Sequence, residues 1–301
     1  MRPSAHQRRW GYSTVSDFEW LRDPTDPKSD TRPIQVLIAT ALSKPDEELT
    51  YWNAVAALQW RGTLEVFNRA DRLCQSPCSV ERRLGADILG QLGCPDRSFP
   101  KECTQVLLKI LEREENKEVL CAILVALSHH QAPEAIGPAS RFRHHADHEV
   151  RYGVVLALTG YEDQEAHVVL IELTRDADAE VRDWATFALG TQSETDTPAI
   201  RDALADRLTD TDVDTRCEAL VGLARRRDQR ALPALHRELR GASVSPLAIE
   251  AATLFAIPQL TKQLIALRPR RDGDTSLLEQ AIQACLADPR LAASRTCDKV
   301  G

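Results

Sequence analysis

The segment DADAEVRDWATFALG, residues 176–190, decides the fold of this chain. Its AEVR motif recurs as HEVR at 148–151 and, more loosely, as VDTR at 213–216, and an apolar run rich in Ala and Leu follows each copy. The arginines of the three copies, Arg151, Arg182 and Arg216, are separated by 31 and 34 residues. A period in this range is typical of stacked helical pairs. The sequence therefore predicts an all-α, right-handed α-solenoid.

Weaker copies extend the repeat in both directions. SVERRLGADILG (79–90) aligns with the central copy through Arg82, and a further copy follows Asn116, with Leu120 at the arginine position. Tyr51 begins the first copy, and LAIEAATLFAI (247–257) is the last recognisable one. Degenerate copies at the ends are expected, because the terminal units of a stack face water on one side.

Each copy contains an inner helix whose packed face follows from the spacing of its small and apolar residues. Val181, Ala185 and Leu189 lie on one helical face, and Asp178 is placed to cap the helix N-terminus. Asp210 and Asp212 lie in a polar repeat loop, where we expect them to be solvated. Second helices are predicted between the inner ones, over residues 166–176, 199–210 and 231–241.

Nine residues of the central copy form a recognisable pattern: Asp176, Asp178, Val181, Arg182, Trp184, Ala185, Ala188, Leu189 and Gly190. This pattern resembles HEAT repeats, especially the short bacterial type also found in phycobilin-lyase-like proteins. The resemblance covers roughly residues 47–257 and indicates fold more than function, because such repeats serve in scaffolds, lyases, nucleic-acid enzymes and toxin-neutralising proteins. It implies that the repeated Arg and Asp tie adjacent repeats together, in a structural ladder of Arg82, Arg151, Arg182, Arg216 and Asp178.

We predict three parts along the chain. Residues 1–33 form an aromatic-rich N-terminal cap or arm, residues 34–290 form the repeat solenoid, and residues 291–301 form a frayed C-terminal tail. The first part contains more aromatic residues than a disordered arm would carry, which favours a cap over the first repeat rather than a separate binding arm. These aromatic residues are Trp10, Tyr12, Phe18 and Trp20.

Composition and charge narrow the class of protein. Hydrophobic residues make up 43% of the chain and charged residues 28%, as in a soluble helical protein. No apolar run approaches the roughly 18 residues of a membrane span, and no apolar signal core follows the basic start, so we expect a cytoplasmic protein. The formal net charge of −7 argues against nucleic acid, whose phosphates require clustered Lys and Arg. Basic clusters at 225–227 and 268–271 do not follow the repeat.

Motifs for catalysis or metal binding are weak or missing. The chain has no P-loop, GxGxxG, HExxH or GxSxG motif. We therefore expect no cofactor, and the sequence favours a binding protein over an enzyme. Four of the eight cysteines lie close together, but only the first two form a tight pair of the kind seen in zinc sites. We expect reduced thiols and no metal at this group, which comprises Cys74, Cys78, Cys94 and Cys103.

The helix positions opposite the packed face form a candidate binding stripe. These positions lie one residue after each repeat arginine and four residues further on. They are more apolar than an exposed helix face should be, which leaves two interpretations: packing against the next inner helix, or an amphipathic concave groove that suits a protein or peptide. The candidate partner-binding residues of this concave face are Trp52, Arg83, Asp87, Tyr152, Leu156, Asp183 and Phe187.

Together these features predict a non-catalytic protein-binding scaffold. The acidic balance suits a basic partner, and an immunity-type protein that neutralises a basic toxin domain is one such scaffold. Two alternatives stay open. A nucleic-acid-binding or repair protein of the HEAT-like glycosylase type would have a continuous basic concave face, and a bilin lyase-like protein would have a deep apolar pocket with a buried acid or thiol.

Overall fold

The computed structural model describes residues 26–270 and 275–287, and every regular element within them is a helix. The predicted N-terminal aromatic cluster and the predicted C-terminal tail lie outside these residues. The chain divides into two compact units, Met1–Phe142 and Arg143–Gly301, each of which is described by itself. Within the described residues, no helix is long and apolar enough to cross a membrane.

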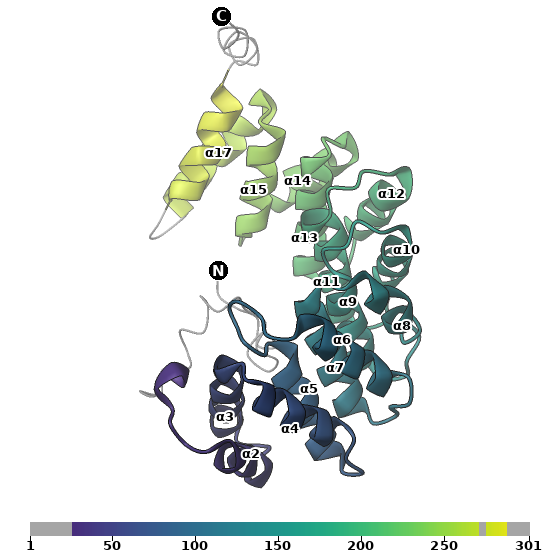
Figure 1. Ribbon diagram of the computed structural model, residues 1–301. Helices are drawn as coiled ribbons and strands as arrows, with labels where there is room; N and C mark the ends of the chain where they lie inside the picture. The colour runs from purple at the N-terminus through teal and green to yellow at the C-terminus, as the bar shows by residue number, and fades with distance from the viewer. Residues whose placement is uncertain (1–25, 271–274, 288–301) are drawn as a thin grey trace, which may run out of the picture. The chain divides into compact units, whose positions relative to one another are not determined.

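The first unit is built of helices that pack in successive pairs. The inner helices α3, α5 and α7 pack side by side, while α4 and α6 pack behind them (Figure 1). The elements in chain order are η1 (Pro27–Ser29), α2 (Ile34–Ser43), α3 (Glu48–Arg61), α4 (Leu64–Cys74), α5 (Ser79–Gly90), α6 (Pro100–Leu111), α7 (Lys117–His130), η2 (Pro133–Ala135) and α8 (Ile136–Ser140).

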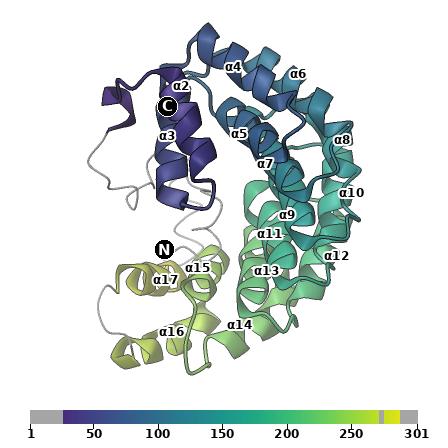
Figure 2. The ribbon, with the colours of Figure 1, turned by 90° about the horizontal axis from the view of Figure 1, so that it is seen from below.

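The second unit repeats this plan in two rows. Helices α9, α11, α13 and α15 pack side by side and form the row that we call the first-helix row, and α10, α12 and α14 form the second-helix row behind it (Figure 2). The elements are α9 (His148–Leu158), α10 (Gln164–Leu173), α11 (Ala179–Phe187), the π-helix η3 (Ala188–Gln192), α12 (Pro198–Arg207), α13 (Val213–Arg225), η4 (Gln229–Ala231), α14 (Leu232–Glu238), α15 (Pro246–Phe255), η5 (Pro258–Leu260), α16 (Thr261–Leu267), η6 (Arg268–Arg270) and α17 (Ser276–Leu286).

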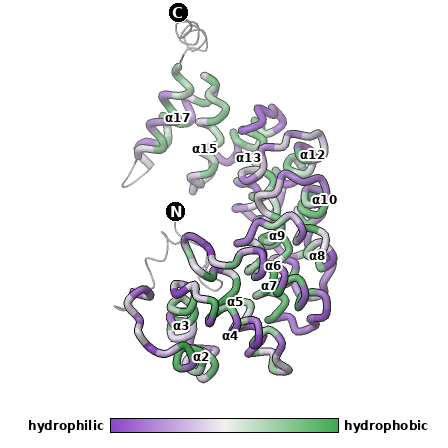
Figure 3. The backbone as a smooth tube through the Cα atoms, in the orientation of Figure 1, coloured by the Kyte–Doolittle hydropathy of each residue, from purple (hydrophilic) through white to green (hydrophobic). Residues whose placement is uncertain are grey.

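Helix α11 begins at a side-chain cap and buries one face. The carboxylate of Asp178 accepts hydrogen bonds from the backbone N–H groups of Glu180 and Val181, which would otherwise lack a partner at the helix start. Val181, Ala185 and Leu189 are fully buried. Hydrophobic and hydrophilic residues alternate along the helices of this unit, as expected where each helix has one packed face (Figure 3).

The two glycines Gly190 and Gly222 explain how closely the first-helix row packs. A Cβ atom added to Gly222 would lie 2.6 Å from the Cα of Gly190, and one added to Gly190 would lie 3.1 Å from the Cα of Gly222. No side chain therefore fits between α13 and the π-helix that follows α11. The glycine that ends the central sequence motif is needed for this contact.

In four of the repeats an arginine ties the inner helix to the acidic residue that ends the following helix or lies in the loop after it. The Nε and Nη2 atoms of Arg182 donate to the two carboxylate oxygens of Asp210, each at 3.0 Å. Its Nη1 donates to the carbonyls of Asp176 and Ala177, just before its own helix. One guanidinium thus fixes two successive loops through a bidentate ion pair. The same bidentate geometry joins Arg82 to Glu114 and Arg151 to Asp176, whereas Arg216 donates through Nε to Oε1 of Glu238 at the end of α14, at 3.0 Å.

Asp210 is not solvated, so the expectation from its loop position was wrong. Its side chain is 4% exposed, because the guanidinium of Arg182 covers it. Its Oδ1 also accepts a hydrogen bond from the backbone N–H of Asp212, at 3.0 Å. Burial raises the pKa of Asp210, but the hydrogen bonds from Arg182 and from that N–H lower it further, so the net pKa lies below its ordinary value. Asp212 in turn caps α13.

Arg226 performs a second structural task that the sequence did not indicate. Its side chain is 5% exposed and reaches back across the end of the π-helix. The C-terminal carbonyls of a helix have no partner within the helix, and a buried guanidinium with several donors satisfies them. The carbonyls that accept from Arg226 belong to Leu189, Gly190, Ser193, Thr195 and Gly222, at 2.9–3.1 Å.

Candidate partner-binding surface

In the first unit, three of the candidate residues meet around Tyr51. The Tyr51 hydroxyl donates to Oδ2 of Asp87 at 2.6 Å, and Nε of Arg83 lies 3.6 Å from the same oxygen. The Arg83 guanidinium lies 5.2 Å from the centre of the Tyr51 ring, and Trp52 contacts that ring edge-on with centroids 5.3 Å apart. Tyr51, on α3, was not among the candidates, yet it holds this group together.

Within this group, Asp87 is a support and Arg83 is the more accessible charge. Burial raises the pKa of Asp87, and the positive charge of Arg83 and the Tyr51 hydroxyl counter that rise. Asp87 is buried, whereas Arg83 and Trp52 are half-buried. A carboxylate in this position orients a guanidinium rather than meeting a partner itself.

In the second unit, an aromatic cluster joins α9 and α11. Trp184 contacts Tyr152 edge-on with ring centroids 5.7 Å apart, and contacts Phe187 in the same way at 5.6 Å. Tyr152 and Leu156 are 7% and 6% exposed, because α11 packs over them. Trp184 and Phe187 are half-buried, so they present the accessible part of the cluster.

Asp183, beside this cluster, is an unusually desolvated carboxyl. Its Oδ1 is buried and has no hydrogen-bond partner among the described residues. Burial, and then repulsion from Asp214 and other carboxylates, raises the pKa of Asp183 to about 7. Glu218 on α13 behaves in the same way: burial, followed by repulsion from Asp183 and Glu250, raises its pKa to about 8. Carboxyls with such pKa values often occur at functional sites.

Counting from the repeat arginines missed Glu218. The count placed Cys217 on the stripe, but Cys217 is fully buried, and its neighbour Glu218 is the half-buried residue. Adjacent residues lie ~100° apart around a helix axis, so a difference of one residue in the count separates the buried Cys217 from the half-buried Glu218. Trp184 packs against Tyr152 and is itself half-buried.

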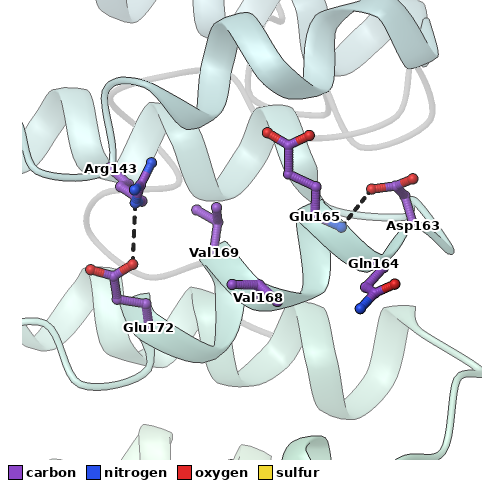
Figure 4. A pocket seen from close by; sticks show the side chains of 7 residues that line it. All are labelled: Arg143, Asp163, Gln164, Glu165, Val168, Val169 and Glu172. Atoms are coloured by element: carbon purple, nitrogen blue, oxygen red, sulfur yellow. Dashed lines mark hydrogen bonds and ion pairs between the residues drawn. The ribbon is translucent and has the colours of Figure 1, made fainter.

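A shallow pocket lies on the second-helix row, away from these residues. It is lined by charged side chains around two valines, and Val168 is 58% exposed (Figure 4). Arg143 and His144 both contact the carboxylate of Glu172, at 3.2 and 3.3 Å. This hollow is open to solvent, unlike the deep apolar cavity that would enclose a large apolar chromophore. The lining residues are Arg143, Asp163, Gln164, Glu165, Val168, Val169 and Glu172.

The cysteines are described in seven of eight positions, all as free thiols. Five of them are buried: Cys74, Cys103, Cys121, Cys217 and Cys285. Burial raises the pKa of the Cys103 thiol to about 12, so it is an unreactive, protonated group. Within the described residues, no three His, Cys, Asp or Glu side chains are grouped as they would be to hold a metal ion.

Stacked helical pairs with a repeated Arg–acid ladder define the class of α-helical repeat proteins. The family model for HEAT repeats matches residues 104–190 and 167–256, which together are just over half of the chain. The chain belongs to the HEAT-repeat family.

Known proteins resemble the chain over most of its length. Protein YibA of Escherichia coli K12 is 28% identical over 210 residues, covering 66% of this chain and 73% of YibA. The X-ray structure of Escherichia coli YibA superposes with a TM-score of 0.70 at 22% identity, over 96% of this chain and 99% of that one. An engineered protein, 19% identical over 88% of this chain and 81% of its own, has a TM-score of 0.49. The YibA structure supports the fold of this chain.

Proposed function

We propose that this chain is a non-catalytic protein-binding scaffold that engages its partner through the first-helix row of the second unit. One observation carries the proposal: the half-buried aromatics Trp184 and Phe187 lie beside the desolvated carboxyl of Asp183. Partly exposed aromatic side chains next to charged groups are typical of the centres of protein interfaces. Arg83 and Trp52 of the first unit are the proposed secondary contacts.

The finer proposal is an immunity-type role in the cytoplasm, with a basic toxin domain as the partner. The net charge of −7 supports a positively charged partner, and such a partner would stabilise the ionised forms of Asp183 and Glu218. The same net charge disfavours the nucleic-acid alternative, because a phosphate-binding face needs clustered Lys and Arg. The charged, open pocket on α10 lends no support to the bilin lyase-like alternative.

Partner capture followed by calorimetry with variants tests the proposed function. Phe187→Ala removes an accessible aromatic, and Asp183→Arg reverses a charge in the same row. A hot-spot truncation costs ~2 kcal/mol or more, so each should weaken binding roughly thirtyfold. Glu165→Gln, an exposed change on α10, is the matched control and should bind normally. Recovery of DNA or RNA in place of a protein would overturn the proposal.

A further inference from the structure

Three carboxyls cross the first-helix row on consecutive helices: Asp183 on α11, Glu218 on α13 and Glu250 on α15. All three are half-buried. After burial, the strongest influences on Asp183 and Glu218 are other carboxylates, which raise both pKa values. Helices α11 and α13, and α13 and α15, pack side by side, and Asp183 and Glu250 are the two charges that act most strongly on Glu218.

The carboxylates that pair with the repeat arginines of the same unit have a different environment. Asp176 and Asp210 each accept two hydrogen bonds from one guanidinium, at 2.7–3.0 Å. Asp183, by contrast, has a buried oxygen without a hydrogen-bond partner among the described residues. The ladder acids, Asp176 and Asp210, are thus neutralised by arginines within the protein. The row of Asp183, Glu218 and Glu250 should therefore attract positively charged groups from outside it.

Aromatic rings adjoin one end of this row of carboxyls. Trp184 contacts Phe187 and Tyr152, and both Trp184 and Phe187 are half-buried. Tryptophan faces attract ammonium and guanidinium groups, and flat rings accommodate the aliphatic stems of lysine and arginine. The acid–aromatic surface, which we define as Asp183, Trp184, Phe187, Glu218 and Glu250, therefore combines both elements of cation recognition.

We propose that the acid–aromatic surface docks a lysine- or arginine-rich segment of a partner protein, whose cationic groups pair with the three carboxyls across α11, α13 and α15. This inference rests on the proposed function and specifies the chemistry of the partner. Adjacent packed helices lie ~8–10 Å apart. A chain in the polyproline II conformation advances ~3.1 Å per residue with three residues per turn, so positive side chains at every third residue share one face, ~9 Å apart, and match the spacing of the helices.

Binding of such a segment should change the number of protons that the protein holds. A cation beside Asp183 or Glu218 favours the ionised carboxyl, so complex formation releases protons near neutral pH. The groups that face Asp183 are Glu180 on its own helix, Asp210 and Asp212 in the loop before α13, Asp214 on α13, and the Tyr152 hydroxyl on α9. Those that face Glu218 are Asp183, Asp214 and Glu250. None of these neighbours carries a positive charge, so they do not cancel the effect.

The test uses the full chain and a labelled synthetic peptide of about ten residues, with lysine at every third position and serine elsewhere. Affinity is measured by fluorescence anisotropy at about pH 6 and about pH 8.5, at ~0.15 M ionic strength. Calorimetry in buffers of different ionisation enthalpy counts the protons. We expect affinity to rise at least ~10-fold between the two pH values, with release of about one proton per complex near pH 7.

Variants assign the effect to the surface. The double variant Asp183→Asn, Glu218→Gln should bind the peptide at least ~10-fold more weakly at about pH 8.5 and lose the pH dependence. These changes remove desolvated charge, so the variant stays folded. Glu165→Gln should match the wild type. An absence of binding by the wild type, an unchanged profile in the double variant, or equal binding of a glutamate peptide would overturn the inference.

The natural partner separates this inference from the proposed function. If Phe187→Ala weakens partner binding while the double variant and pH have no effect, the surface binds protein but not through a basic segment. If neither variant changes partner binding, the proposed function itself fails.

Discussion

Replacing Asp183 by asparagine should stabilise the protein, and the gain should depend on pH. The pKa of Asp183 is raised from 3.8 to about 7 by burial and by repulsion from neighbouring carboxylates. Between these values the folded state holds a proton that the unfolded state has lost. Stability therefore falls as pH rises from about 4 to about 7, and the full cost is present above pH 7. Asparagine has the shape of the carboxyl without its charge, so it avoids this cost.

The size of the expected stabilisation follows from the pKa shift of Asp183. Each pKa unit corresponds to ~1.4 kcal/mol, so a rise of about three units corresponds to ~4 kcal/mol. Local relaxation and water near a half-buried side chain reduce this electrostatic cost. We therefore expect the free energy of unfolding to rise by about 2–4 kcal/mol at about pH 8 in the asparagine variant. At ~2 °C per kcal/mol for a chain of this size, the melting temperature should rise by about 4–8 °C. At about pH 4 the gain should vanish.

Urea unfolding followed by circular dichroism, at several pH values between about 4 and 8.5, measures the effect. Glu165→Gln, an exposed change on α10, is the control. A variant no more stable than the wild type at high pH would show that Asp183 is solvated or forms an ion pair with a cationic side chain. A gain that is the same at every pH would refute the electrostatic explanation.

Three further changes test the architecture by thermal and urea unfolding. Arg182→Ala should cost about 2–3 kcal/mol, because it removes the bidentate partner of the 4%-exposed Asp210, which keeps a hydrogen bond from Arg207, and Arg182→Lys should restore part of the loss. Gly222→Ala should cost about 1–3 kcal/mol, since the new Cβ would lie 2.6 Å from the Cα of Gly190; an unchanged stability would mean that the two helices separate freely. Trp184→Ala should cost about 3 kcal/mol through lost packing against Tyr152, and an unchanged melting temperature would place the ring outside the core.

The helical pairs were predictable because a short period constrains the whole stack. The spacing of Arg151, Arg182 and Arg216 indicated an inner helix at each copy, and the helices α9, α11 and α13 lie there. The predicted second helices differ from α10, α12 and α14 by a few residues at their ends. In a repeat protein, each unit needs its neighbours to bury an apolar face, so periodicity carries the fold.

The parts that the sequence did not reveal depend on contacts between repeats. The π-helix after α11 and the carbonyl contacts of Arg226 follow from the approach of Gly190 and Gly222, which are distant in sequence. The sequence did not point to Glu218, because the repeat spacing indicated its neighbour Cys217, which is buried. Local patterns identify which residues recur, whereas tertiary packing decides which of them reach the surface.

Hydrogen exchange of the complex with the captured partner tests the central claim most directly. The account predicts that the partner protects amide groups in α11 and α13, around Phe187 and Glu218, and leaves the exposed residues of α10 unchanged. Protection confined to α10 and α12, with α11 and α13 exchanging as in the free protein, would contradict it.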